Sequence, residues 1–159
     1  MENQLINVSE INLDEIRITA EEYYKRGDFY CSEAIMKTIK DAFEMPISDD
    51  IIRVTSGLGG GMGMSGCVCG ALSGGNVVLG LVFGRTTPKD PQVDITMRLT
   101  NELHDIFRAH HKTACCRIHL KKVEFGSDDH IAQCSYFTGD MAYEVAKIIC
   151  RELNIKTIS

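Results

Sequence analysis

The sequence lacks the features that mark several common classes of protein. It has no basic surplus, with 17 lysines and arginines against 22 aspartates and glutamates, so nucleic acid is not expected as a partner. Phosphate binding requires a basic face. The opening residues, MENQLINVSE, contain neither the basic nor the apolar segment of a secretory signal. We therefore expect a cytoplasmic protein whose thiols are kept reduced.

The sequence also lacks motifs for a metal or nucleotide site built within one short segment. There is no pair of CxxC motifs, which argues against a zinc ribbon, and no CxxCH, which argues against covalently bound haem. Gly61, Gly63 and Gly66 match GxGxxG, but only a weak strand signal precedes them and no GK[ST] follows. Any metal site must therefore be assembled from distant segments.

Strand signals are few, and helical periodicity covers nearly the whole chain. The 159 residues, 44% of them hydrophobic, are enough for one domain with its own core. We predict a single all-α domain over residues 1–159, a bundle of about five to seven helices. Predicted helix starts are Asn12, Asp28, Ser48, Cys67 (with Ser65 as its cap), Asp90-Pro91 and Asp128 or Asp129, and residues 116–126 stay ambiguous.

Residues 54–84 contain no charge and no histidine, and are numerous enough to span a bilayer. Eleven of the fourteen glycines fall among them, however, and such a segment is too rich in glycine for a lipid-facing helix. We expect no membrane span, but a central glycine-rich loop followed by a buried helix. Gly66, Gly70 and Gly74 recur every four residues and would let another backbone approach, either within the chain or across a homodimer interface.

Seven cysteines in a reducing compartment indicate a metal site, redox chemistry or core packing before structural disulfides. The predicted helix starts place Cys31, Cys67, Cys69 and Cys134 in opening turns. Free N–H groups and the helix dipole favour thiolate there, and thiolate is both the nucleophile and the metal ligand. Cys31 and Cys134 fit equally well as small buried core residues.

The remaining three cysteines are weaker candidates. Cys150 lies within the last predicted helix, away from any loop, and is best interpreted as a core residue. Cys115 and Cys116 are neighbours, and a disulfide between adjacent residues is strained. At most one of these two is therefore expected to be a ligand.

Cys31, the run Cys69-Gly70-Ala71-Leu72-Ser73-Gly74, Cys116 and Cys134 resemble the redox-active C_GCAxxG_C_C family, which is defined by four spaced cysteines and a CGAxxG motif. The preceding glycines, in GLGGGMGMSGCVCGALSGG, resemble its glycine-rich signature, and the likeness covers roughly residues 16–153. The resemblance implies an all-helical domain, a redox role and genes that often lie near those of transporters. It also implies kinship with a domain of split-Soret cytochromes c, with which an iron–sulfur centre is associated.

The resemblance makes Cys31, Cys69, Cys116 and Cys134 the catalytic and metal-binding candidates, whereas Cys67 and Cys115 depart from the family pattern. The first hypothesis is that these four hold an iron–sulfur cluster and pass electrons to an unidentified redox partner protein. The glycine loop would then supply backbone N–H groups to the cluster sulfurs. Its candidate cofactor-binding residues are Gly61, Gly63, Gly66 and Gly70.

Two alternatives stay open. One is a thiol–disulfide oxidoreductase or redox sensor with Cys69 as the reactive thiol, because Cys69 is expected near a helix start. The other is a non-enzymatic protein that binds zinc or another soft metal and serves a membrane transporter. Histidines available in principle as further zinc ligands are His104, His110, His111, His119 and His130, although a lone histidine on a helix usually has a surface or structural role.

Overall fold

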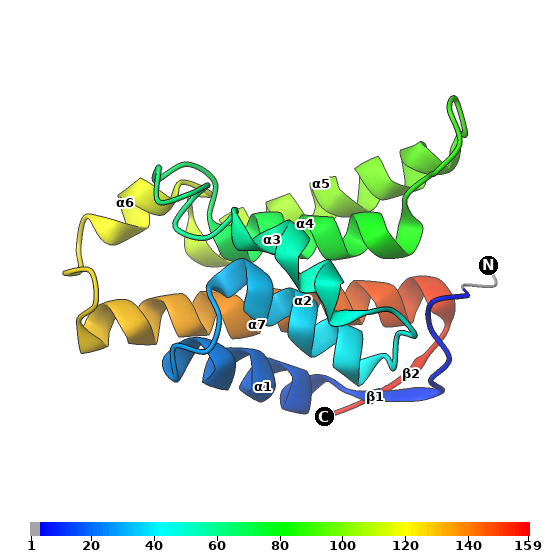
Figure 1. Cartoon of the computed structure of the whole chain (residues 1–159), viewed down its shortest axis with the longest axis horizontal. Coiled ribbons are helices and arrows are strands. Elements are labelled where there is room, and N and C mark those ends of the chain that lie inside the picture. Colours follow the sequence, from blue (N-terminus) through cyan, green and yellow to red (C-terminus); the bar gives the residue numbers. More distant parts are fainter. Residues whose placement is uncertain (1–3) are drawn as a thin grey trace.

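Seven α-helices account for most of residues 4–159, the part of the chain that this computed structural model describes (Figure 1). The protein is 63% helical, which confirms the predicted all-α class. The elements that build the bundle are α1 (Leu13–Lys25), α2 (Cys31–Ala42), the 3-10 helix η1 (Asp49–Ile52), α3 (Arg53–Ser56), α4 (Gly70–Phe83), α5 (Gln92–His111), α6 (Cys116–Leu120) and α7 (Asp128–Leu153).

Helix α7 is the longest element and runs along the length of the molecule, with α1 on one side and α4 and α5 on the other (Figure 1). Two strands of three residues each, β1 (Glu10–Asn12) and β2 (Lys156–Ile158), pair in parallel next to this bundle. The sequence did not predict them, because three residues are too few to show the alternation of a strand. They join the beginning of the described chain to its end.

Three predicted helix starts are confirmed by their caps. The side chain of Asn12 accepts a hydrogen bond from the Glu15 N–H at the start of α1. Ser48 accepts from the Asp50 N–H at the start of η1. Helix α7 begins at Asp128, as predicted, and its cap is the preceding Ser127. Side-chain oxygens at these positions satisfy N–H groups that have no partner within the helix.

Two predicted starts are wrong. Helix α2 begins at Cys31 with Tyr30 as its N-cap, rather than at Asp28, because the Tyr30 N–H donates to the carboxylate of Glu33 and closes a capping box. Helix α4 begins at Gly70 rather than near Cys67. The residues before it form turns with positive φ angles, including Gly66 at +71°, and a right-handed helix does not accommodate them.

Close packing of α4 against α2 depends on glycine. A Cβ added at Gly74 would lie 2.6 Å from Ser32 Cα, so only a glycine allows the two backbones to approach this closely. Gly70 packs against Cys31 at the start of α2. The predicted small-residue face thus packs within the chain through Gly70 and Gly74, while Gly66 lies in the preceding loop.

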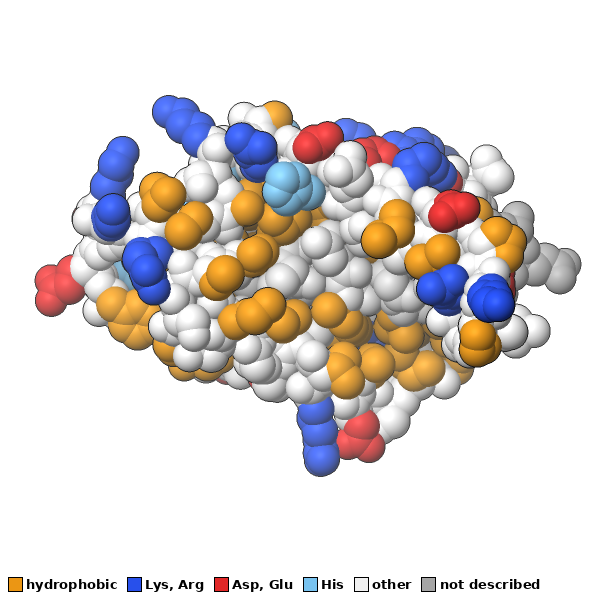
Figure 2. Space-filling view, turned by 90° about the horizontal axis from the view of Figure 1, so that it is seen from above, with side chains coloured by type: hydrophobic (Ala, Val, Ile, Leu, Met, Phe, Trp, Pro, Cys, Tyr) orange, Lys and Arg blue, Asp and Glu red, His pale blue; other side chains and the backbone are white. Residues whose placement is uncertain are grey.

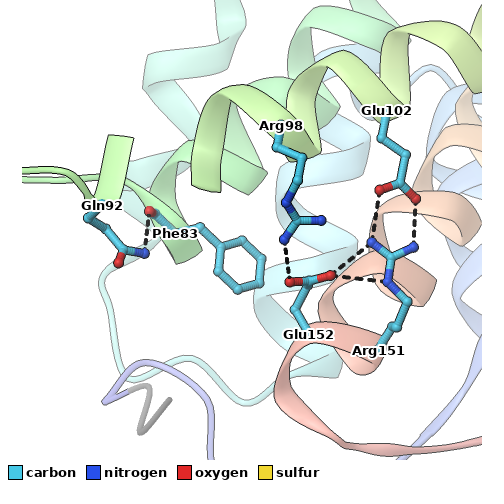
Figure 3. A network of polar contacts seen from close by, with 6 residues as sticks. All are labelled: Phe83, Gln92, Arg98, Glu102, Arg151 and Glu152. Carbon is cyan, nitrogen blue, oxygen red and sulfur yellow. Dashed lines mark hydrogen bonds and ion pairs between the residues drawn. The ribbon is translucent and has the colours of Figure 1, made fainter. Parts of the chain in front are cut away.

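Helices α5 and α7 are also joined at the surface by an ionic network (Figure 3). The guanidinium of Arg151 contacts both carboxylate oxygens of Glu102, at 2.6 and 2.8 Å, and Arg98 contacts Glu152 at 2.8 Å. The two ion pairs link α5 to α7 at the surface of the bundle.

Within residues 4–159, no helix combines the length and the apolar character needed to cross a membrane. The uncharged stretch 54–84 instead contains the short helix α3, the turns of the glycine loop and the 14-residue helix α4. On the face seen in Figure 2, lysine and arginine side chains stand apart from one another, mostly toward the edges, and hydrophobic side chains lie between them.

Candidate functional site

Four of the seven cysteines line a single narrow cavity. They are Cys31, Cys69, Cys116 and Cys134. The cavity has a volume of about 30 Å³, room for roughly two water molecules, and its walls are mainly apolar. The other residues that matter for its chemistry are Tyr24, Gly60, His130 and Phe137. Segments far apart in the sequence thus bring the four family cysteines together.

Backbone hydrogen bonds hold Cys69 and Cys116 at this cavity. The Cys69 N–H donates to the Ala114 carbonyl at 2.7 Å, and the Cys116 N–H donates to the Cys67 carbonyl at 2.6 Å. Val68 and Cys115 form the antiparallel bridge between these bonds. The end of the glycine loop and the segment before α6 therefore form a short two-stranded clamp that fixes two of the cysteines relative to each other.

Helix α2 supplies Cys31 as its first residue, and α7 supplies Cys134 from its second turn. The start of α2 is anchored by the Ser32 hydroxyl, which donates to the Thr55 carbonyl at 2.8 Å. The Cys31 sulfur lies against Gly70, where a Cβ would overlap it. Gly70 therefore lets Cys31 approach the beginning of α4, where Cys69 is the N-cap residue.

The other three cysteines lie elsewhere. Cys67 is exposed and Cys115 half-buried on a surface pocket beside Arg108 and Lys112. Cys150 is 1% exposed within α7 and belongs to the hydrophobic core. Of the adjacent pair, only Cys116 lines the cavity.

The glycine loop contributes differently from the prediction. Of the four predicted glycines, only Gly70 lines the cavity, while Gly60, which no motif singled out, lines it as well. Gly61 has a φ of +70° and leaves room for Cys116, because a Cβ there would lie 2.8 Å from the Cys116 Cβ. Gly63 has no neighbour close to its Cβ position, and Gly66 packs beside Arg117.

Burial raises the pKa of all four cavity thiols. The pKa of Cys31 rises to about 12 and that of Cys134 to about 11, while those of Cys69 and Cys116 are also raised. Neighbouring thiolates add to the effect, since Cys134 acts on Cys31, and Cys31 acts on Cys69. At neutral pH, without a bound cation, the four groups are therefore thiols rather than thiolates.

The N–H groups expected to favour thiolate are present, but burial outweighs them. Backbone hydrogen bonds from Ser32 and Gly60 lower the pKa of Cys31, and one from Ala71 lowers that of Cys69. Among residues 4–159, no lysine or arginine lines the cavity to add a positive charge. The prediction that backbone N–H groups at helix starts lie near Cys31 and Cys69 is therefore confirmed. The prediction that these cysteines favour the thiolate is wrong, because their pKa values are raised.

A chain of polar contacts runs from Gly126 through His130 to Tyr24, beside Cys134. The Gly126 N–H donates to Nδ1 of His130 at 3.0 Å, and burial lowers the pKa of this histidine, so its proton is on Nε2. Nε2 lies 3.4 Å from the Tyr24 hydroxyl, which is then free to donate to the Cys134 sulfur. Helical periodicity could not identify Tyr24 as part of the site, because it cannot distinguish a functional residue at this position of α1 from a core residue.

The four sulfurs are spaced more widely than the ligands of one zinc ion. Four sulfurs bound tetrahedrally at 2.3 Å lie about 3.8 Å apart. In the described chain, no three cysteine sulfurs lie within 4.8 Å of one another. An iron–sulfur cluster distributes its thiolates over several irons and so requires a wider spacing than a single ion does.

This arrangement defines a class of protein: a helical bundle with a buried site of four cysteines from four segments. The chain belongs to the family described as "Putative redox-active protein (C_GCAxxG_C_C)", whose model matches residues 29–148. The match includes all four cavity cysteines. A search of curated proteins finds no match, and a search of solved structures finds none either.

The raised pKa of Cys134 predicts an unusual pH profile for its alkylation. Because thiolate is the reacting form, the rate for the metal-free protein should rise about tenfold per pH unit from pH 7 to pH 10. Tyr24→Phe should slow the reaction at each pH, since it removes a hydrogen bond that lowers this pKa. Mass spectrometry of the Cys134 peptide measures both rates. A plateau near pH 8.5, the value of an ordinary thiol, would contradict the prediction.

Proposed function

We propose that Cys31, Cys69, Cys116 and Cys134 form one redox centre that binds an iron–sulfur cluster and passes electrons to a partner protein. The observation that carries this proposal is their shared cavity, from which the other three cysteines are excluded. In the described part of the chain no carboxylate lines the cavity beside the four sulfurs, which form a donor set for a soft metal centre.

The high thiol pKa values support a metal centre over free thiolate chemistry. A cysteine nucleophile requires a lowered pKa, but burial raises those of Cys31, Cys69 and Cys134. A bound cation removes this obstacle, because it supplies the positive charge that deprotonates coordinating thiols. The same burial that disfavours a reactive thiol therefore favours a site in which the sulfurs are metal ligands.

A cluster bound here would supply one-electron exchange. The protein would hold it through the four sulfurs and limit the access of water through the apolar walls. The Tyr24 hydroxyl donates to the Cys134 sulfur, and N–H groups of Ser32 and Gly60 donate to Cys31. Such hydrogen bonds reduce the negative charge on sulfur and raise a reduction potential.

A thiol–disulfide function is the second candidate, and the proximity of Cys31 to both Cys69 and Cys134 favours it. These sulfurs lie close enough for the charge on one to raise the pKa of another. When the protein acts as the reductant, two of its thiols would form a disulfide. The two electrons and two protons released would convert an external disulfide into two thiols. A hydrogen bond from the Tyr24 hydroxyl would then favour the thiolate form of Cys134, the form that attacks a disulfide.

Purification without oxygen distinguishes the two functions. We expect broad visible absorption, with iron and acid-labile sulfide in matching amounts per chain. A protein that stays colourless and free of iron after attempted reconstitution would overturn the cluster proposal and favour the dithiol function. Zinc alone would indicate the soft-metal-binding alternative, and a subsequent exchange with iron and sulfide would test whether zinc occupies a cluster site.

A further inference from the structure

A second group of metal-ligating side chains lies outside the cysteine cavity. Nδ1 of His110 and Nε2 of His111 each lie 2.8 Å from the same oxygen, Oδ2 of Asp140. All three ligating atoms lie within 4.8 Å of one another. In residues 4–159 no other set of three histidine, cysteine or acidic side chains meets this spacing.

The two histidines converge although they are consecutive residues of a helix, where neighbouring side chains diverge by about 100°. They meet because Asp140, in the middle of α7, lies between them. His111 and Asp140 are nearly fully buried, whereas the side chain of His110 is 40% exposed. The group is therefore fixed by packing on one side and open to solvent on the other.

The geometry points to a binding site for a divalent first-row transition metal, with His110, His111 and Asp140 as its three protein ligands. Two imidazole nitrogens and one carboxylate are a donor set for zinc or non-haem iron, and three protein ligands leave further positions for water. An imidazole ring can bind a metal through one nitrogen while its proton is on the other, so the nitrogens that face Asp140 are available as ligands.

The position of the group at the end of α5 also favours a cation. His110 and His111 are the last two residues of this 20-residue helix, whose C-terminal carbonyl groups carry partial negative charge. Asp140 places a carboxylate oxygen at the same point, 2.8 Å from one ring nitrogen of each histidine. Helix end and carboxylate thus add negative charge at the same point.

Arg17 is the positive group that opposes a cation at this position. Its guanidinium lies 3.8 Å from Oδ1 of Asp140, the oxygen that does not face the imidazoles, and it stacks on the ring of Tyr143. This contact orients the carboxylate so that Oδ2 points at both histidines. Arg17 therefore has a positioning role, as outer-shell partners of metal ligands commonly do.

This site is separate from the cysteine centre but close to it. The ring of Phe137 lines the cysteine cavity and packs against the His111 ring, with 4.3 Å between the ring centroids. One aromatic side chain therefore lies between the two groups. The inference does not rest on the proposed iron–sulfur function, because its ligands include no cysteine.

Titration of the reduced, chelator-treated protein with Co²⁺ tests the site. Cobalt bound by nitrogen and oxygen gives only weak visible bands, whereas cobalt bound by thiolates adds an intense near-ultraviolet charge-transfer band. We expect the wild-type protein to bind one Co²⁺ that contributes no charge-transfer band. In His110→Gln and Asp140→Asn this component should bind at least tenfold more weakly, with any thiolate component unchanged.

His104→Gln is the matched control. His104 lies on the same helix, its side chain is 42% exposed, and it has an acidic neighbour, Asp105, at 3.5 Å. It should leave the cobalt titration unchanged, and circular dichroism checks that every variant is folded. Equal affinities for the wild type, His110→Gln and Asp140→Asn would overturn the inference. So would a titration in which all bound cobalt shows the thiolate band.

Discussion

Replacing Cys69 by serine should reduce the iron content of the reconstituted protein to below about one tenth of the wild-type value. Cys69 lines the cavity and is 7% exposed, so its sulfur would be a ligand that serine oxygen replaces poorly. Cys67→Ser, two residues away, should leave the iron content unchanged, because Cys67 is exposed and lies outside the cavity. Iron and sulfide analysis with visible spectroscopy measures both.

The adjacent pair near α6 provides a second matched comparison. Cys116→Ser should abolish the visible absorption, whereas Cys115→Ser should retain it, since only Cys116 faces the cavity. Serine is nearly isosteric with cysteine, so differences in folding should be small, and thermal unfolding of the metal-free variants checks this. If Cys67→Ser or Cys115→Ser lost as much iron as its neighbour, the assignment of the centre to the cavity would be wrong.

The candidate site was partly predictable because the sequence carries two independent signals, the cysteine motif of the family and the helical periodicity. The resemblance to the four-cysteine family pointed to Cys31, Cys69, Cys116 and Cys134, and these are the four that line one cavity. Helix periodicity alone left Cys31 and Cys134 equally acceptable as core residues. The cavity itself depends on long-range packing, such as the clamp between Cys69 and Ala114, which leaves no local pattern in the sequence.

The polar surroundings of the site were not predictable for the same reason. Tyr24 and His130 lie 106 positions apart in the chain and meet only because α1 packs along α7. The glycine loop was recognised as a loop, but which glycine would reach a sulfur depends on its exact turns. Positive φ angles at Gly60, Gly61 and Gly66 set those turns and place Gly60, rather than Gly61, on the cavity wall.

Most of the fold was predicted from local rules, and the predictions that failed have both local and long-range causes. The cap of α1 and the start of α7 were predicted within one residue, because side-chain caps are short-range features. The start of α2 was misplaced because Asp28 fits a cap by composition, whereas the capping box uses the Tyr30 backbone and Glu33. The pair of β1 and β2 joins distant segments and had no signal at all.

A substitution of Gly74 by alanine should lower the stability of the protein by about 2 kcal/mol, with a Tm lower by about 6 °C. The added Cβ would lie 2.6 Å from Ser32 Cα, and a backbone atom cannot turn aside as a side chain does. The higher helix propensity of alanine offsets only part of this cost, about 0.5–1 kcal/mol. Thermal and denaturant unfolding of the metal-free protein measure the change.

Gly80 is the control for this prediction, because it lies on the same helix and a Cβ there would meet nothing within 4 Å. Gly80→Ala should therefore stabilise the protein by about 0.5–1 kcal/mol, the opposite sign. Gly74→Ala should also weaken iron binding, because it moves α4, whose N-cap is Cys69, away from α2, whose first residue is Cys31. Equal stability of the two variants would show that α4 and α2 do not approach this closely, and it would leave the joint positioning of these cysteines without its packing basis.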